Sequence, residues 1–285
     1  MPSTDDPLRH TSPFGKVALP PIACTALGLT GPVYVNAGGV TRLETPAGGA
    51  WAKTLEPPRN AVNRMVLPIL GTLVPLAILR RDKAARGPDT LLRQAARIRE
   101  LAGKGLPVPA LLYADREFLI TADCGQVIEK AVRSAHRRVQ SGFDEAALHA
   151  ILLAITRTIA DIHRAGTAHG RPKMRDFVWR DGTVTILDLE EQPWDVMSMA
   201  DAQARDVLLW IHDLCSAPLS RDIAPDAAAI LLAGMAADTR LRLRRLLRIM
   251  RLGGPATRLM LRLLPGNREL IAGIAAYDIL RDRIG

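Results

Sequence analysis

The segment from His163 to Glu191, HRAGTAHGRPKMRDFVWRDGTVTILDLEE, restricts the fold more than any other part of the sequence. Residues 144–164, which lead into it, predict a long helix because their apolar side chains recur at helical spacing. These side chains are Leu148, Ile151, Leu152, Ile155, Ile159 and Ile162. A charged loop follows, and then two strand-like runs, FVW and TVTIL, on either side of Arg-Asp-Gly. This order predicts a buried helix, a loop and a β-hairpin.

The predicted hairpin has an acidic residue at each end. Asp176 precedes it, and Asp188 follows it. Because a hairpin returns its two ends to one place, we expect both carboxylates in one site. Carboxylate oxygens are the ligands that Mg²⁺ prefers, and a phosphoryl group in transfer also needs a nearby cation. The loop supplies such cations in Arg171, Lys173 and Arg175.

The residues before this segment predict a β-rich region with one helix. Strand-like sequences lie on both sides of Gly38-Gly39 and run through Lys53. Residues 89–103 have a helical pattern, and two more strand-like sequences, LPVPALLYAD and REFLITAD, follow them. The chain from Ala200 onward has helical patterns. We therefore predict a two-lobed α+β protein, with a small β-rich N-lobe and a larger helical C-lobe.

We expect three parts along the chain: a flexible arm (residues 1–22), the N-lobe (23–123) and the C-lobe (124–285). The arm is polar and proline-rich. The N-lobe contains an apolar insertion, residues 60–88, whose uncharged run 65–79 is short for a transmembrane helix. Two prolines and a glycine interrupt that run, so core packing and membrane contact are equally good interpretations.

The positive charge of the chain is concentrated near its end. The net charge is +9, and residues 240–268 contain nine arginines and no acidic residue, interleaved with leucine and methionine. This pattern favours either a solvated basic helix face or attachment to an anionic membrane surface. Only 4% of the residues are aromatic, which disfavours nucleic-acid binding by base stacking. Three scattered cysteines and no signal-peptide pattern predict a cytoplasmic protein, with peripheral attachment to the inner face of the cytoplasmic membrane as a further expectation.

The loop and hairpin resemble the catalytic and metal-binding segments of the protein-kinase-like superfamily. There the loop reads H-R-D-x-K-x-x-N, or H-G-D-x-x-x-x-N in small-molecule kinases, and a hairpin leads to D-F-G. Here His169-Gly170 matches the start, Asp176 takes the asparagine position, and Asp188-Leu189-Glu190 takes the D-F-G position. The sequence looks closest to the lipopolysaccharide-core (Kdo and heptose) kinases and to bacterial toluene-tolerance proteins. The resemblance extends over residues 31–215.

The resemblance implies a protein-kinase-like fold with an ATP site in the N-lobe. By position, Lys53 would pair with the α- and β-phosphates, and Gly38 and Gly39 would be the remnant of the glycine-rich loop. Asp123 and Cys124 would lie at the hinge around the adenine. From the residues alone, a plain hairpin turn at the two glycines is the alternative.

The resemblance also implies roles for the C-lobe residues. Asp176 and Asp188 would hold Mg²⁺, and Lys173 would face the transferring phosphate. The helix that contains QARDVLLWIHDL, with Asp206, would support the catalytic loop.

Two positions depart from the superfamily pattern. The position of the catalytic base holds Arg171, which cannot accept a proton. The helix residue expected to be a glutamate that pairs with Lys53 falls on Gln94, which is alternatively an ordinary surface residue of the helix.

These features leave two main hypotheses. The intact acid pair favours an ATP- and Mg²⁺-dependent kinase that acts on a sugar or lipid-linked acceptor at the cytoplasmic membrane face. Asp176 would then be both metal ligand and base, and Arg171 would hold an anionic acceptor. The two departures favour a pseudokinase that binds a nucleotide or a partner in envelope homeostasis. A basic nucleic-acid-binding protein is a third, less favoured hypothesis.

Overall fold

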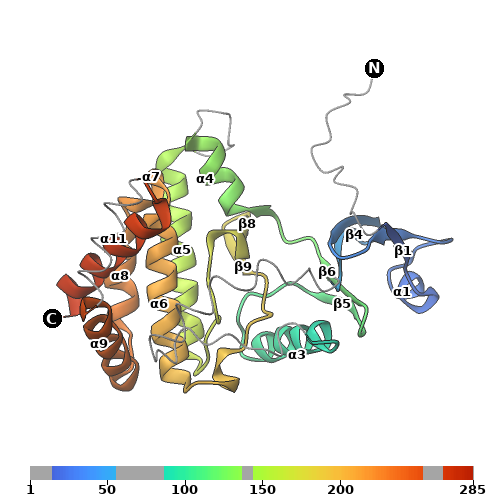
Figure 1. Cartoon of the computed structure of the whole chain (residues 1–285). Helices are drawn as coiled ribbons and strands as arrows, with labels where there is room; N and C mark the ends of the chain where they lie inside the picture. Colours follow the sequence, from blue (N-terminus) through green and yellow to red (C-terminus); the bar gives the residue numbers. More distant parts are fainter. Residues whose placement is uncertain (1–14, 56–86, 137–143, 253–265, 285) are drawn as a thin grey trace. The chain divides into compact units, whose positions relative to one another are not determined.

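The computed structural model describes residues 15–55, 87–136, 144–252 and 266–284 (Figure 1). These residues form two compact units. The first unit holds residues 15–55, 87–100 and 109–123, and the second holds the remainder. The chain is α+β, with a sheet-rich N-terminal region and a helical C-terminal part, as predicted. Most of the predicted apolar insertion, residues 60–86, lies outside the described residues.

The first unit is built on an antiparallel sheet in the order β3-β4-β6-β5. Its strands are β3 (Val40–Thr45), β4 (Gly48–Thr54), β5 (Leu111–Ala114) and β6 (Phe118–Ala122). The helix α3 (Thr90–Gly103) lies between β4 and β5 in the sequence, and its last three residues belong to the second unit. The predicted order of strands, the helix α3 and two more strands is present, but a further helix, α1 (Pro21–Ala26), precedes β2 (Tyr34–Asn36) and was not predicted.

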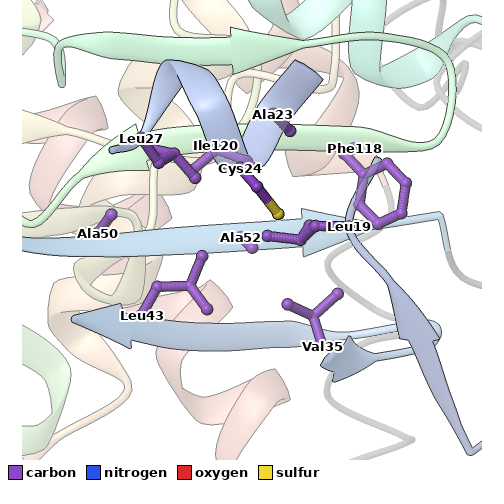
Figure 2. Packing of buried hydrophobic residues seen from close by; sticks show 10 residues of the cluster. All are labelled: Leu19, Ala23, Cys24, Leu27, Val35, Leu43, Ala50, Ala52, Phe118 and Ile120. Carbon is purple, nitrogen blue, oxygen red and sulfur yellow. The ribbon is translucent and has the colours of Figure 1, made fainter. Parts of the chain in front are cut away.

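An N-terminal ribbon and helix cover one face of this sheet. Strand β1 (Lys16–Ala18) pairs with β2 (Tyr34–Asn36), and α1 (Pro21–Ala26) lies between them in the sequence. Their apolar side chains join those of the sheet in one buried cluster (Figure 2). Its members are Leu19, Ala23, Cys24, Leu27, Val35, Leu43, Ala50, Ala52, Phe118 and Ile120.

The flexible arm predicted for residues 1–22 is therefore too long. Residues 16–22 belong to the fold, because Leu19 is buried and the strand before it pairs with β2. Burial of such side chains stabilises the fold by about 25 cal/mol per Å² of apolar surface. Residues 1–14 of the predicted arm lie outside the described residues.

The second unit is mainly helical. Its helices are α4 (Ile128–His136), α5 (Glu145–Arg164), α6 (Met199–Cys215), α7 (Pro218–Arg221), α8 (Ala224–Ala233), α9 (Ala237–Leu252) and α11 (Arg268–Ile284), with 3-10 turns η4 (Met174–Asp176) and η5 (Pro193–Asp195). Helix α5 begins after Asp144, whose carboxylate accepts a hydrogen bond from the Ala147 N–H at 2.6 Å. Helices α5 and α6 lie side by side (Figure 1), and the buried Trp210 indole donates to the Thr156 hydroxyl at 2.9 Å. The predicted helix at 144–164 is confirmed.

One helix among the described residues, α5, is long and apolar enough to cross a membrane by length and composition. Half of its most apolar stretch is buried inside the protein. Its buried side chains include all six that set the helical pattern in the sequence. Helices in the core of globular proteins pass the same length and composition test.

The predicted hairpin forms the second sheet, with strand order β7-β8-β9. Its strands are β7 (Gln126–Val127), β8 (Phe177–Arg180) and β9 (Thr183–Ile186). The turn residues Asp181 and Gly182 have φ values of 49° and 84°. Positive φ at both central residues is the geometry that a two-residue hairpin favours, and the Asp-Gly pair is suited to it.

Several of the arginines in the basic region help to hold the fold together. The Arg240 and Arg244 guanidinium groups donate to the carbonyls of Leu232 and Ile284, at the C-terminal ends of α8 and α11. Cations at these positions satisfy carbonyls that no helical N–H reaches. Arg244 is nevertheless exposed, as are Arg245, Arg248 and Arg251. The solvated basic face predicted for residues 240–268 therefore comprises only part of the arginines in α9, and residues 253–265 lie outside the described residues.

Candidate functional site

One buried carboxylate fixes the start of the loop that follows α5. Asp206 on α6 is fully buried and accepts hydrogen bonds from the backbone N–H groups of His169, at 2.6 Å, and Gly170, at 2.9 Å. The His163 Nε2 lies 3.2 Å from the same carboxylate. Hydrogen bonds to a charged acceptor are stronger than neutral ones, so these contacts fix the start of the loop. The predicted support of the loop by this helix is confirmed.

A second buried contact fixes the turn between α5 and the loop. The Gln203 side-chain amide donates to the carbonyls of His163, at 3.1 Å, and Thr167, at 2.9 Å. Its oxygen accepts from the Thr239 hydroxyl on α9 at 2.8 Å. The amide group thus has partners on both sides, which a buried polar group requires.

Asp213, near the end of α6, holds the middle of the loop. Its carboxylate accepts the Met174 N–H at 2.7 Å. Burial raises the pKa of Asp213, although this hydrogen bond and the charge of Lys173 lower it. Lys173 therefore lies beside a carboxylate that partly offsets its positive charge.

Asp176 is the most deeply buried acid of the loop, with 3% of its surface exposed. Its carboxylate accepts the Lys173 N–H at 3.1 Å, and its own carbonyl accepts the Leu187 N–H at 2.6 Å. The first hydrogen bond closes the turn η4, and the second links the loop to the far end of the hairpin. Asp176 is therefore fixed by backbone contacts on both sides.

The two acids at the ends of the hairpin influence each other. Burial and then the neighbouring Asp188 carboxylate raise the pKa of Asp176 to about 8, while Arg175 and Arg171 lower it. Asp188 has a φ of 51°, in the left-handed region, where aspartate occurs more often than most residues other than glycine. The sequence prediction that the hairpin brings these acids together is supported by their interaction.

The acid pair fits a divalent cation bound jointly with phosphate. A cation between two neighbouring carboxylates offsets the repulsion between their charges. Magnesium commonly takes only one or two protein carboxylates, with water and phosphate oxygens as its other ligands. Among the residues that the structure describes, no three histidine, cysteine or acidic side chains gather as a metal cluster. A Mg²⁺ site built on these two carboxylates would be completed by water and phosphate oxygens.

Arg171, which the resemblance aligns with a catalytic base, is part of a group of three charged side chains. Its Nε lies 3.2 Å from the Glu191 Oε1, and the Arg205 Nη2 lies 2.8 Å from the Glu191 Oε2. Arg205 and Glu191 are 9% and 18% exposed at their side chains, whereas Arg171 is 34% exposed. The backbones also meet here, because a Cβ on Gly170 would lie 2.4 Å from the Glu191 carbonyl oxygen. Arg171 is thus held firmly, and it still reaches solvent.

Lys53 lies in the first unit, in the middle of the sheet. It pairs with Val40 of β3 and with Leu119 of β6. Its neighbours Ala52 and Thr54 are buried, and Ala52 belongs to the apolar cluster, so the alternation of β4 directs Lys53 to the opposite face. The predicted phosphate contact of Lys53 remains a prediction.

The turn of Gly38 and Gly39 connects β2 to β3, next to Thr54. Gly38 has a φ of 67°, and the Gly39 N–H donates to the Thr54 hydroxyl at 3.1 Å. The Thr54 hydroxyl in turn donates to the Asn36 carbonyl at 2.9 Å. The structure therefore places both glycines beside the end of the strand that carries Lys53. The turn joins strands of two different sheets, since β2 pairs with β1 and β3 pairs with β4, so the alternative of a plain hairpin turn is wrong. A role of the two glycines in phosphate binding remains a prediction.

Gln94, Asp123 and Cys124 occupy three different environments. Gln94 is 5% exposed, so the alternative of an ordinary surface residue is wrong. Its side-chain oxygen has no hydrogen-bond donor among the described residues, so it does not accept a bond from Lys53 there. The Asp123 carboxylate lies 3.5 Å from Arg42, and Asp123 is the last residue of the first unit. Cys124 is partly buried and belongs to the second unit.

Sequence reasoning missed five residues that hold the loop: Glu191, Gln203, Arg205, Asp213 and Thr239. Each acts through a partner that is distant in the sequence. Gln203, Arg205 and Asp213 lie in QARDVLLWIHDL, but only Asp206 of that segment was assigned a role. Glu191 directly follows Asp188-Leu189-Glu190, and no motif of the sequence analysis contains Thr239.

Comparison with known proteins does not indicate a function for this site. No model of a known protein family matches the chain. A protein of Haemophilus influenzae named "Uncharacterized protein" is 28% identical over 122 residues, which make up 41% of this chain and 45% of that protein. The match thus spans less than half of the relative. It assigns neither a family nor an activity.

Proposed function

We propose that the protein is an ATP- and Mg²⁺-dependent phosphotransferase of the protein-kinase-like superfamily, of the lipopolysaccharide-kinase type. Its acceptor would be a sugar or a lipid-linked alcohol at the inner face of the cytoplasmic membrane. The observation that carries the proposal is the buried Asp176 beside Asp188, at the two ends of a hairpin. A loop with Lys173 and Arg171 adjoins this pair, and Asp206 fixes that loop from α6.

The proposed division of labour follows from the contacts of each side chain. Asp176 and Asp188 would hold Mg²⁺, which when bound neutralises phosphate charge and orients the phosphates. Lys173, next to Asp213, would face the transferring phosphoryl group. The resemblance assigns the remaining nucleotide phosphates to Lys53. Because phosphoryl transfer has a loose transition state, positioning and charge neutralisation contribute more than full proton abstraction.

Asp176 is the best candidate for the proton acceptor in this chain. Arg171 cannot take that role, since a guanidinium does not deprotonate in proteins. A bound cation would lower the pKa of Asp176 from about 8, and the ionised carboxylate could then accept a proton. The same residue would thus serve as metal ligand and as base.

A non-catalytic pseudokinase is the second candidate. It is favoured by the ion pair between Arg171 and Glu191, which commits the base position to a salt bridge. It is also favoured by Gln94, whose buried amide cannot form an ion pair with Lys53. Such a protein would bind a nucleotide or a partner in envelope homeostasis, without phosphate transfer.

Nucleotide binding is the first property to test. A ligand that binds only the folded state at 100 times its Kd stabilises the protein by about 2.7 kcal/mol. Thermal unfolding would be measured with ATP, with ATP plus Mg²⁺, and with both in Asp188→Asn. Asparagine tolerates the left-handed backbone of this position, so the variant removes the charge with little added strain.

We expect stabilisation by ATP that depends on Mg²⁺ and is lost in Asp188→Asn. The exposed Asp222, after α7, provides a matched control, and Asp222→Asn should respond as the native protein does. No stabilisation by ATP under any condition would refute both the kinase and the nucleotide-binding pseudokinase. Stabilisation without phosphate transfer to any alcohol would favour the pseudokinase.

A further inference from the structure

The Arg171–Glu191–Arg205 group has one positive charge in excess. Arg205 and Glu191 form the closer contact, at 2.8 Å, and Arg205 is almost completely buried. A buried guanidinium requires a carboxylate partner, because an unpaired buried charge is strongly destabilising. Glu191 is therefore committed first to Arg205, and the charge of Arg171 is only partly offset.

The geometry leaves the outer part of Arg171 available to a ligand. In the described part of the chain, the ion pair of Arg171 with Glu191 is made through Nε, at 3.2 Å. The two Nη groups of a guanidinium form a planar fork that matches the oxygens of a phosphate or a carboxylate. The Arg171 side chain is 34% exposed, so part of it is open to an anion in solvent.

Arg171 also acts on the acid pair. Its charge lowers the pKa of Asp176, which places the guanidinium near that carboxylate. A cation held by Asp176 and Asp188 would add positive charge near Arg171, and this charge would favour an anion beside the guanidinium.

We propose that Arg171 is an anion-binding residue, held in position by Glu191 and Arg205, and that the acceptor carries a phosphate or carboxylate group beside the hydroxyl that reacts. The role of this anion as part of an acceptor rests on the proposed function. The anion site itself rests only on the three side chains and their contacts. Glu191 and Arg205 are positioning residues, since they act through Arg171.

The site can be tested at the level of the single residue with an arginine-selective dicarbonyl reagent. Modification of Arg171 would be followed by peptide mass spectrometry in chloride buffer of constant ionic strength, with added inorganic phosphate or acetate. Arg164, at the end of α5, is 64% exposed and pairs with Asp161, so it serves as an internal control. An anion at ten times its Kd occupies about nine-tenths of the sites and should slow modification of Arg171 about tenfold.

We expect phosphate or acetate to protect Arg171 and to leave Arg164 unchanged, and the more protective of the two anions indicates the group on the acceptor. Equal effects at both arginines, or none at Arg171, would overturn the proposal. Stabilisation by phosphate in thermal unfolding is the second readout. It should be present in the native protein, weaker in Arg171→Lys, which lacks the fork, and absent in Arg171→Gln. Equal stabilisation of the three proteins would also overturn the proposal.

Substitutions of Glu191 distinguish a positioning role from a purely electrostatic one, because the two roles predict opposite changes in the affinity for phosphate. Glu191→Gln removes a negative charge, so a purely electrostatic role predicts tighter phosphate binding. If Glu191 instead orients the fork, the variant binds phosphate more weakly. Glu191→Asp keeps the charge but shortens the side chain, and it should also bind more weakly. Tighter or unchanged binding in both variants would refute the positioning role.

The anion test and the nucleotide test address separate proposals, so either one can give a negative result without the other. Protection of Arg171 without any stabilisation by Mg²⁺ and ATP would keep the anion site and refute the proposed kinase. Stabilisation by Mg²⁺ and ATP without protection of Arg171 would keep a nucleotide site and overturn the inference about the acceptor.

Discussion

The protonation of Asp176 should be visible in the stability of the folded protein. Its ordinary pKa is 3.8, and burial beside Asp188 raises it to about 8. Between these two values the unfolded chain has released the proton and the folded protein still holds it. Stability is therefore greatest at low pH within this window, falls as the pH rises toward 8, and is constant above it.

The size of the effect follows from the shift. About four pKa units at 1.36 kcal/mol each correspond to a loss on the order of 5 kcal/mol between pH 4 and pH 8, as an upper bound. Asp176→Asn removes the titrating group and keeps an oxygen that can accept the Lys173 N–H. The variant should thus be more stable than the native protein at pH 8, with a flatter dependence on pH.

The assay is urea unfolding, followed by circular dichroism, at pH 5, 6, 7 and 8. The exposed Asp222 provides the control, since Asp222→Asn should retain the pH dependence of the native protein. Identical pH dependence in the native protein and in Asp176→Asn would refute the reasoning. Greater stability of the native protein at pH 8 would show that the carboxylate is ionised and well solvated there.

Three further substitutions test the contacts that shape the loop. Asp206→Ala leaves the buried N–H groups of His169 and Gly170 without an acceptor, and should cost about 2–5 kcal/mol in urea unfolding. Gly170→Ala would force a Cβ against the Glu191 carbonyl and should cost more than Gly166→Ala, which has an open environment at a φ of 75° and should cost about 1–2 kcal/mol. Equal costs for these two variants would contradict the close approach at Gly170. Arg244→Gln should lower the free energy of unfolding by about 1 kcal/mol, because it removes the contact with the end of α11. Arg248→Gln, at another exposed position of α9, should change that free energy by less than about 0.5 kcal/mol. Thermal unfolding of the two variants measures the difference.

Local patterns predicted the elements of the second unit well. The six apolar side chains of α5 and the Asp-Gly turn of the hairpin are strong short-range signals, and both elements lie where they were expected. The start of the chain was predicted less well. Strand β1 has three residues, all exposed, and is defined by pairing with β2 rather than by an apolar pattern. A pairing partner in another part of the chain leaves no local trace in the sequence.

The residues of the candidate site likewise fall into those that local sequence predicted and those that it did not. Asp176 and Asp188 were found because a hairpin brings its two ends together, which spacing alone can indicate. Asp206 was found only through the resemblance. Glu191 and Arg205 were not predicted, because their role depends on ion pairs that link them to Arg171. The sequence does not show which charged side chains come into contact in the folded protein. Ion pairs between separate elements are a tertiary property.

The contact between Gln203 and Thr239 has a consequence for anyone who wishes to shorten this protein. The turn that leads into the loop is held by the Gln203 amide, and that amide is completed by a hydroxyl on α9. A fragment that stops before Ala237 would retain every residue assigned to phosphate chemistry. It would still lose the donor for a buried oxygen and the helix that covers α6. A fragment chosen from the motifs alone would therefore keep the residues of the proposed site and lose a contact that positions the loop. A lack of activity in that fragment would not test the proposed function.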